Sequence, residues 1–392
     1  MKGVLYLAWR YLLWHRWKTA ILVLAVTLVV YLPLGLQLVV QQTATDMTAR
    51  ADRSPLLLGS RGSPLELVLN SLYFSGGQPP PLTYGGVRAL EHTDLAVGVP
   101  LYVRFHSQGF PIVGTSLDYF SFRGLEIAAG RQMVRLGEVV VGARVAEELG
   151  LAPGDSLISS PESVFDLAGV YPLKMTVAGV LAPAYNQDDG AIFTDLRTTW
   201  IIQGLGHGHQ DLARPEAAAA VLKKEGDRIV ANASLLQYNE ITPDNIDSFH
   251  FHGSSDDNPL TAILPVPRDE KSRVLLLGRY QGNPQLQLLE PRSVMDELLD
   301  TVFAVQRYVL VAMGLVGVAT AAVVLLVFLL SLRARRAERD TLSRLGGARA
   351  LVSGLMLAEI AIVLILSLAL AALLTGATWI WGGALLQAVV MQ

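Results

Sequence analysis

Three long apolar windows constrain this chain more than any other feature of its sequence. They are Thr19–Val40, Tyr308–Leu332 and Leu351–Leu374. The hydrocarbon core of a bilayer is about 30 Å thick, so roughly 20 apolar residues in a helix cross it. With 52% hydrophobic and 17% charged residues, the chain is predicted to be a membrane protein. The first window is longer than the apolar region of a cleavable signal peptide, about 7–15 residues, and is predicted to remain as an anchor.

The distribution of cations predicts which side of the membrane each segment faces. Residues 1–18 carry four Lys and Arg and no acid, and residues 333–350 carry six Arg against one Asp and one Glu. Residues 41–305 hold 20 Lys and Arg against 31 Asp and Glu. Cations accumulate on the cytoplasmic side of membrane proteins, so the first two segments are predicted to be cytoplasmic and the third external. Three tryptophans among the cations of residues 1–18 predict an amphipathic helix at the inner interface.

Residues 41–305 are long enough for a large domain in which strands and helices alternate. Residues 138–155 predict a strand, a helix closed by Gly150 and a turn, and residues 174–181 predict another strand. Residues 260–291 predict a strand–helix–strand unit, followed by a helix that runs into the second window. The predicted class is α+β outside the membrane and all-α within it. The chain has no cysteine, so this domain is expected to fold without disulfides.

Four of the seven histidines form two His-X-His pairs in or beside two poorly patterned stretches, 204–220, which we predict to contain a linker, and 252–259, which we predict to be another. The pairs are His207/His209 and His250/His252. In an extended segment, residues i and i+2 point to the same face, so each pair could present two imidazoles to a metal ion such as zinc. The alternative is that they are solvated loop histidines that lie far apart in the fold.

Motifs for catalysis or for nucleotide binding are missing from the sequence. It contains no GxxxxGK[ST] loop, so the chain is expected to bind no ATP itself, and any ATPase must be a separate subunit. No Ser-His-Asp set or carboxylate pair stands out, and we expect no catalytic residues. The net charge of −3 and the absence of a basic, aromatic-rich stretch argue against nucleic acid as a partner.

Four stretches of the chain resemble permeases of the MacB/FtsX-type family of ABC transporters. They are SPLLLGSRGSPLELVLNSLYF (54–74), GRQMVRLGEVVVGARVAEELGLAPGD (130–155), MTVAGVLAP (175–183) and TLSRLGGARALVSGLMLAEIAIVL (341–364). The resemblance covers essentially the whole chain. It implies a homodimeric permease that works by mechanotransmission with two copies of a cytoplasmic ATPase, on which ATP and Mg²⁺ would bind. A periplasmic adaptor or lipoprotein is a further partner that the family implies, besides membrane lipid.

The same resemblance implies a location, a substrate class and a subdivision of the external domain. The membrane would be the bacterial inner membrane, and the substrate of export or extraction would be lipid-linked, a peptide or drug-like. A porter-like part is expected near residues 46–115 and 258–304, and a Sabre-like part near 116–250. The rival class is a membrane-anchored receptor, scaffold or regulator of a cell-envelope enzyme without transport.

The number of spans departs from the family pattern of four. The sequence predicts transmembrane helices at 19–40, 306–332 and 351–375, which leaves residues 376–392. This last stretch is short for a crossing, so we expect three spans and an external C-terminal tail. An abbreviated fourth helix over residues 376–392 is the alternative.

The cytoplasmic segment 333–350 is predicted to be the coupling segment to the ATPase. Its helical pattern continues from the second span until a glycine pair, which allows a helix to stop and reverse. Positive-inside topology explains its arginines but not two leucines spaced i, i+3 beside the glycines. In the related permeases this loop is where the ATPase binds. The residues predicted to make this contact are Arg339, Leu342, Arg344, Leu345, Gly346, Gly347 and Arg349.

Glu359 is the one ionisable residue of the third apolar window. An acid inside a membrane is costly and therefore often has a function. Because Glu359 lies about two helical turns from the cytoplasmic end, we favour interfacial anchoring or helix pairing, with a proton relay as the alternative.

Overall fold

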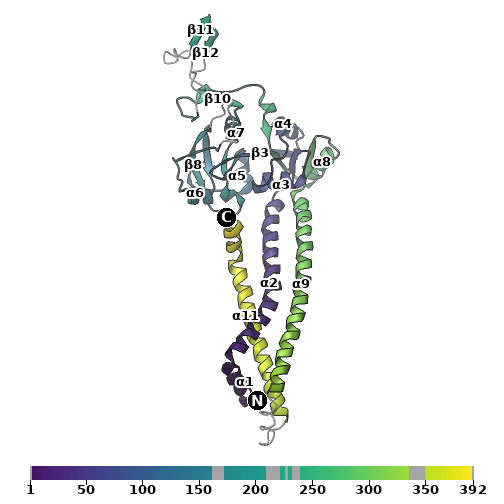
Figure 1. The fold of residues 1–392 in the computed structure, drawn as a ribbon. Coiled ribbons are helices and arrows are strands. Elements are labelled where there is room, and N and C mark those ends of the chain that lie inside the picture. Colours follow the sequence, from purple (N-terminus) through teal and green to yellow (C-terminus); the bar gives the residue numbers. More distant parts are fainter. Residues whose placement is uncertain are drawn as a thin grey trace. The chain divides into compact units, whose positions relative to one another are not determined.

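The computed structural model describes residues 2–160, 172–208, 221–225, 228–231, 239–334 and 349–390. The chain divides into two compact units, shown in Figure 1. The helical unit consists of Met1–Ala49 and Asp296–Gln392, and the sheet unit consists of Arg50–Met295.

Long helices make up the described part of the helical unit. They are α1 (Lys2–Trp14), α2 (Arg16–Asp52), α9 (Pro291–Ala334) and α11 (Arg349–Val390). Among the described residues, α2, α9 and α11 are long and apolar enough to cross a membrane. At 1.5 Å per residue their lengths are about 55–66 Å, roughly twice the hydrocarbon thickness. Each of these helices therefore has the length to continue beyond the bilayer.

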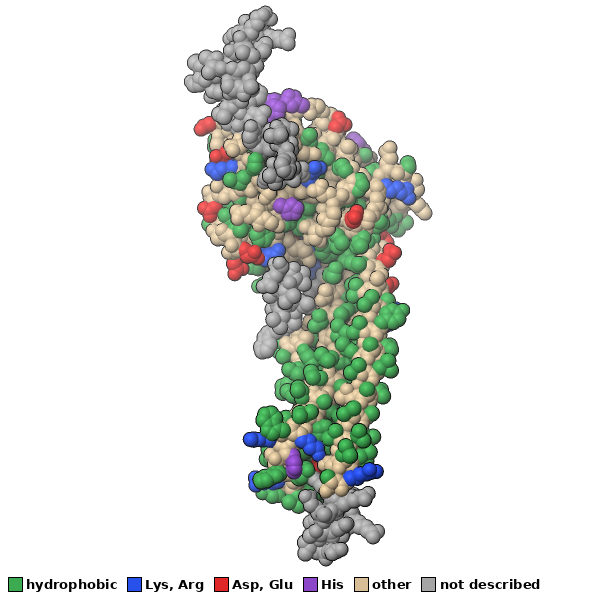
Figure 2. All heavy atoms as spheres, viewed as in Figure 1, with side chains coloured by type: hydrophobic (Ala, Val, Ile, Leu, Met, Phe, Trp, Pro, Cys, Tyr) green, Lys and Arg blue, Asp and Glu red, His purple; other side chains and the backbone are tan. Residues whose placement is uncertain are grey.

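Contacts between the helices of this unit are a mixture of apolar packing and a few hydrogen bonds. Leu12, Leu22 and Val363 are buried together. Thr27 Oγ1 donates to the carbonyl oxygen of Ser367 at 3.3 Å, which links α2 to α11. Figure 2 shows hydrophobic side chains along the helices, with Lys and Arg side chains gathered toward the end at which the N-terminus lies.

The C-terminal part of α11 continues the helix of the third apolar window. The helix runs without a break through Thr375 and Gly376 to Val390. Residues 376–390 are thus the end of α11 and not a separate helix, while residues 391–392 lie outside the described part.

In its described residues, the sheet unit is built on a ten-stranded mixed sheet. Its strand order is β16-β1-β15-β3-β4-β9-β6-β8-β5, and β7 also pairs with β8. Most neighbours are antiparallel, whereas β4–β9 and β6–β8 are parallel. The strands of this sheet are β1 (Leu57–Ser60), β3 (Ala96–Ser107), β4 (Phe110–Thr115), β5 (Ile127–Gly130), β6 (Glu138–Val141), β7 (Ser156–Ile158), β8 (Lys174–Leu181), β9 (Ile192–Asp195), β15 (Ala262–Pro267) and β16 (Leu286–Leu289).

Helices and three smaller strand pairs accompany this sheet in the described part of the unit. Buried apolar side chains on β1, β3, β6 and β9 form the core with the helices that pack on the sheet. The helices are α3 (Pro64–Tyr73), α4 (Gly85–Glu91), α5 (Asp118–Arg123), α6 (Ala143–Leu149), α7 (Leu196–Ile202) and α8 (Glu270–Tyr280), with 3-10 turns η1 (Gln187–Gly190), η3 (Ile246–Ser248) and η4 (Ser255–Asp257). The pairs are β2 (Leu82–Thr83) with β14 (Pro259–Leu260), β10 (Gly206–Gly208) with β13 (Phe249–Phe251), and β11 (Val221–Glu225) with β12 (Arg228–Ala231).

Most elements predicted from the sequence are confirmed. Residues 138–155 form β6 and α6, and Gly150 ends α6 in the left-handed conformation at φ 65°. Residues 260–291 contain β15, α8 and β16 in the predicted order. Residues 204–220, which we expected to contain a linker, include the short strand β10 near their start, and residues 209–220 lie outside the described part. Two glycines in β10 gave this strand no apolar pattern by which it could be recognised.

The two predicted parts of the external domain contribute the two halves of the sheet. Residues 46–115 and 258–304 supply β16, β1, β15, β3 and β4, and residues 116–250 supply β9, β6, β8, β5 and β7. The halves join at the parallel pair β4–β9, in which Val113 is opposite Phe193. The porter and Sabre boundaries themselves remain predictions.

Hydrogen bonds to Glu138 hold the turn formed by the GRQMVRLGE stretch, residues 130–138. The Glu138 carboxylate accepts hydrogen bonds from Arg131 Nη1 at 2.7 Å and from the backbone N–H groups of Val134 at 2.9 Å and Arg135 at 3.0 Å. The Arg131 hydrogen bond, together with these two backbone bonds, lowers the pKa of Glu138 to about 2 in spite of its burial. The turn before β6 is therefore fixed by one ionised side chain.

This pKa predicts an acid-sensitive contribution to stability. A carboxylate whose pKa is depressed in the folded state stabilises it above the unfolded pKa, and that stabilisation is lost as the pH falls. For Glu138 the loss is expected between about pH 4.5 and pH 2, and Glu138→Gln should cost about 2–3 kcal/mol at pH 7. Thermal unfolding of the full chain in detergent between pH 2 and pH 7 checks this. The exposed Glu91→Gln should leave the profile unchanged, and equal profiles for both variants would contradict the assignment.

Candidate functional site

A buried ion pair holds the last turn of α2 within the sheet unit. The guanidinium of Arg50 makes two parallel bonds to Asp188, Nη1 to Oδ2 at 2.7 Å and Nη2 to Oδ1 at 2.8 Å. Arg50 Nη2 also donates to the hydroxyl of Tyr119 at 2.8 Å, and that hydroxyl donates to Asp188 Oδ1 at 2.7 Å. Arg50 Nε donates to the carbonyl oxygen of Leu72. We call Arg50, Tyr119 and Asp188 the anchor cluster.

The anchor cluster is buried and its charges compensate each other. The side chains of Arg50 and Asp188 are 5% and 1% exposed. Burial raises the pKa of the Asp188 carboxyl, but the charge of Arg50 and the hydrogen bonds from Arg50 and Tyr119 outweigh it, so the pKa lies below its usual range. Burial, assisted by the negative charge of Asp188, raises the pKa of the Tyr119 phenol. The cluster is therefore one ionised pair bridged by a neutral phenol.

Asp188 reaches this cluster because the backbone around it lies very close to Gly142. Asp188 lies in η1, which packs against the start of α6. A Cβ on Gly142 would lie 2.4 Å from the carbonyl oxygens of both Asp188 and Asp189. Because that is far inside van der Waals contact, only glycine at position 142 lets η1 come this near.

A second ion pair joins the end of α2 to the start of α9 within the sheet unit. Arg292 Nη1 lies 2.6 Å and 2.7 Å from the two carboxylate oxygens of Asp52. Both side chains are about half exposed, at 50% and 46%. Exposed pairs of this kind contribute little stability, about 0–1 kcal/mol. Of the two ion pairs, the buried one therefore fixes α2 more strongly.

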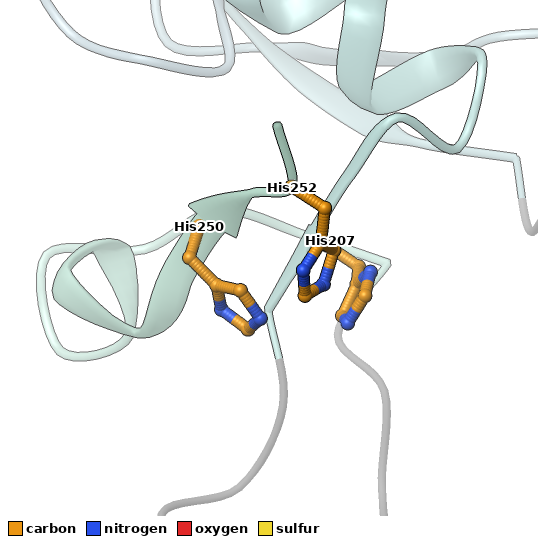
Figure 3. A group of neighbouring side chains, drawn as sticks. All are labelled: His207, His250 and His252. Atoms are coloured by element: carbon orange, nitrogen blue, oxygen red, sulfur yellow. The ribbon is translucent and has the colours of Figure 1, made fainter. Parts of the chain in front are cut away.

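Three histidines lie together on another part of the sheet unit. His207 in β10 is the register partner of His250 in β13, and His252 directly follows β13. Their ring centroids are 4.8 Å apart for His207 and His250, 5.1 Å for His207 and His252, and 4.9 Å for His250 and His252. Figure 3 shows the three rings turned toward one another. We call these residues the histidine cluster.

The alternation of residues in β10 and β13 explains why these rings meet. In β13 the phenylalanines that flank His250 contact the core, and Phe251 packs edge-to-face on Trp200 at 6.4 Å. In β10 the opposite positions are Gly206 and Gly208, where a Cβ would lie 2.6 Å from a phenylalanine ring. The phenylalanine rings thus cover the glycines on one face, and the cross-strand histidine pair is left on the other. The alternative that the histidine pairs lie far apart does not hold for these residues.

The remaining predicted site residues are placed as follows. His209, Arg339, Leu342, Arg344, Leu345, Gly346 and Gly347 lie outside the described residues, and Arg349 begins α11. Glu359 is in α11 and is 6% exposed. Within the helical unit it lies close enough to Lys18 of α2 for an electrostatic interaction, and Lys18 Nζ donates to Ser331 Oγ of α9 at 2.7 Å. Lys18 therefore gives Glu359 an oppositely charged partner on another helix of this unit, as the helix-pairing interpretation requires.

The fold and the apolar helices define a membrane-embedded protein with a large α+β domain outside the bilayer. The family model of the MacB-like periplasmic core domain matches residues 19–234. Because this match covers more than half of the sequence, the chain belongs to the MacB/FtsX-like family of ABC transporter permeases.

Two solved structures are similar to this chain. The extracellular domain of the noncanonic ABC-type transporter YknZ from Gram-positive bacteria is 12% identical, with a TM-score of 0.32, over 60% of this chain and 98% of that one. The periplasmic region of MacB from Actinobacillus actinomycetemcomitans is 11% identical, with a TM-score of 0.32, over 62% of this chain and 91% of that one. None of the curated proteins compared with the sequence matches it.

Proposed function

We propose that this chain is the permease subunit of an ABC-type system that is powered by a separate cytoplasmic ATPase. The observation that carries the proposal is the match of residues 19–234 to the MacB-like periplasmic core domain. The sequence also supports a separate ATPase subunit, since the chain has no GxxxxGK[ST] loop that could bind ATP. In this arrangement the chain has no catalytic residues of its own.

The permease would act by mechanotransmission, as a homodimer with two ATPase copies. ATP binding and hydrolysis would move the cytoplasmic ends of the helices, and α2 and α9 would carry that movement to the sheet unit. Helices longer than the bilayer suit this role. The anchor cluster also supports this mechanism. Its buried bidentate ion pair lies at the end of α2, and two parallel hydrogen bonds allow little relative movement of the groups that they join.

The substrate of such a permease need not pass between the helices. A sheet unit that is moved by the helices can extract or release a lipid-linked, peptide or drug-like molecule outside the membrane, or can switch a cell-envelope enzyme. The rival function is an anchored receptor or scaffold without transport. The two functions differ in one property, since transport or mechanotransmission requires a bound ATPase.

Copurification from the native membrane tests the proposal. The tagged full chain in mild detergent is expected to retain an ABC ATPase subunit in equal amount, and the complex should hydrolyse ATP. If the chain purifies alone even after mild cross-linking of the membrane fraction, no ATPase is bound to it. That result would favour the receptor or scaffold function.

Orientation in the membrane is a second testable part of the proposal. We predict residues 1–18 and 333–350 inside and the sheet unit outside, in accord with the Lys and Arg side chains at one end of the helical unit. Because the chain has no cysteine, single probes carry no background. Tyr185→Cys, at a position that is 88% exposed in the sheet unit, and Gln392→Cys should react with an impermeant maleimide in intact spheroplasts, and Ala337→Cys only after lysis. Labelling of Gln392→Cys only after lysis would contradict the three-span topology.

A further inference from the structure

The histidine cluster offers chemistry that the permease function does not use. We propose that His207, His250 and His252 bind one transition-metal ion of the zinc class. Their ligating nitrogens all lie within 4.8 Å of one another. Imidazole nitrogen is a preferred ligand of Zn²⁺ and of its neighbours Cu²⁺, Ni²⁺ and Co²⁺, whereas Mg²⁺ and Ca²⁺ prefer oxygen.

The distances in the cluster are compatible with coordination after small side-chain movements. A Zn–N bond of about 2.0–2.1 Å places the nitrogens around a tetrahedral ion about 3.3 Å apart. The longest separation, within 4.8 Å, therefore has to shorten by about 1.5 Å. Rotation of the imidazoles about their χ angles supplies such a movement, since aromatic χ2 is broad. The register of β10 and β13 stays as it is.

One hydrogen bond already selects the tautomer that a metal requires. His250 Nδ1 lies 3.0 Å from the carbonyl oxygen of Ser248. A carbonyl oxygen can only accept, so Nδ1 carries the proton and donates, and Nε2 is then the ring nitrogen that can coordinate a metal ion. Metal-bound histidines usually donate their second ring nitrogen to a backbone carbonyl or a carboxylate in this way.

The cluster is positioned by packing that does not depend on a metal. The phenylalanines on the opposite face of β13 fix the strand against Trp200 and the core. His207 and His250 are 43 positions apart in sequence but are held opposite each other by strand pairing. A bound ion would cross-link β10 to β13 and to the residue that follows β13.

The three histidines supply three of the four ligands of a tetrahedral site. Among the described residues, no fourth His, Cys, Asp or Glu belongs to the cluster. His209, the remaining histidine of the two His-X-His pairs, lies outside the described residues. The fourth position would be taken by a residue of that part of the chain, by water or by an exchangeable ligand.

Zinc binding by the full chain tests this inference independently of transport. Chain purified in detergent and stripped with a chelator is titrated with ZnCl₂ by calorimetry, and its metal content is measured after dialysis. We expect one Zn²⁺ per chain and an affinity at least about 100-fold lower in His252→Ala and in His207→Ala, because loss of a ligand should exceed the 10–100-fold cost of losing a supporting hydrogen bond. His252 is exposed, so we expect its replacement to leave the fold intact. The control is His106→Ala, an exposed histidine of β3 outside the cluster, which should bind zinc as the unaltered chain does.

A spectroscopic signal identifies the ligands. Co²⁺ in place of Zn²⁺ should give the intense visible absorption of a tetrahedral ion with the unaltered chain and with His106→Ala, and lose it with His207→Ala. Two results would overturn the inference: no zinc retained by the unaltered chain, or equal zinc affinity in the unaltered chain, His207→Ala and His252→Ala.

Discussion

Replacing Asp188 with alanine is expected to lower the free energy of unfolding of the sheet unit by about 3–5 kcal/mol, since it leaves a buried guanidinium without its counter-ion. The side chains of Arg50 and Asp188 are almost fully buried, so water cannot take the place of the lost carboxylate. The corresponding decrease in Tm is about 10 °C for a domain of this size. Thermal and urea unfolding of the full chain in detergent measure both quantities.

The chain supplies a matched control for this prediction. Asp52 lies on the same turn of α2 as Arg50 and forms an ion pair with Arg292 that is about half exposed. Asp52→Ala should therefore cost no more than about 1 kcal/mol. If Asp188→Ala is as mild as Asp52→Ala, the anchor cluster does not stabilise the sheet unit.

A double variant separates the pair from its parts. Arg50→Met removes the buried cation, so Asp188→Ala in that background should lower the free energy of unfolding far less than it does alone. The interaction energy between the two substitutions is expected to be at most about 3 kcal/mol. Additive effects would mean that the two side chains act independently. With ATPase bound, Arg50→Met should also reduce transport more than ATP hydrolysis, because the end of α2 would no longer be held.

The parts of the fold that were predictable from the sequence depend on local pattern. The alternation in residues 174–181 and the glycine after α6 predicted β8 and the helix end correctly, since both signals lie within one element. The apolar windows predicted α2, α9 and α11 for the same reason. Local propensity and periodicity are sufficient where the neighbours along the chain decide the conformation.

The anchor cluster was not predictable because its members are distant in sequence. Arg50 and Asp188 are 138 positions apart, and neither belongs to a motif. The available signal was indirect: Gly142 in the VVVGAR stretch and an Asp-Asp-Gly turn at 188–190. Neither signal tells which backbone approaches the glycine, since that is decided by the order of the strands in the sheet.

The histidine cluster was half predictable. The i, i+2 spacing correctly puts His250 and His252 on one side, but it does not tell whether the two His-X-His pairs converge, and His209 lies outside the described residues. That His207 lies beside His250 follows from the register of β10 with β13. That register follows from glycines on one strand opposite phenylalanines on the other, a complementarity that is visible only once the pairing is known.

Replacing Leu345 with aspartate is expected to detach the ATPase while the chain still folds and inserts. Leu342 and Leu345 are apolar residues in a segment rich in arginine, just before Gly346-Gly347. If they occupy a groove on the ATPase, as we propose, a carboxylate at position 345 would be buried there without a partner and would cost several kcal/mol. A cost of about 3 kcal/mol lowers the affinity by about 100-fold, so copurification should be lost.

A neighbouring cation should have a smaller and salt-dependent effect. Arg344 is expected to lie at the rim of the contact, where charge sets the rate of association and the register. Arg344→Ala should therefore weaken the complex less than Leu345→Asp does, and the difference from the unaltered chain should be largest at low ionic strength.

The control for the leucine is an equal charge in the same segment but away from the glycine pair. Ala337→Asp adds a carboxylate eight positions earlier, and it should leave ATPase binding within a few-fold of the unaltered chain. Quantitative copurification and the ATP hydrolysis rate of the complex are measured for both variants, with membrane insertion checked by protease protection of the sheet unit. If Leu345→Asp retains the ATPase and hydrolyses ATP at the full coupled rate, the arginines of residues 333–350 serve only to orient the chain in the membrane, and the ATPase must bind elsewhere.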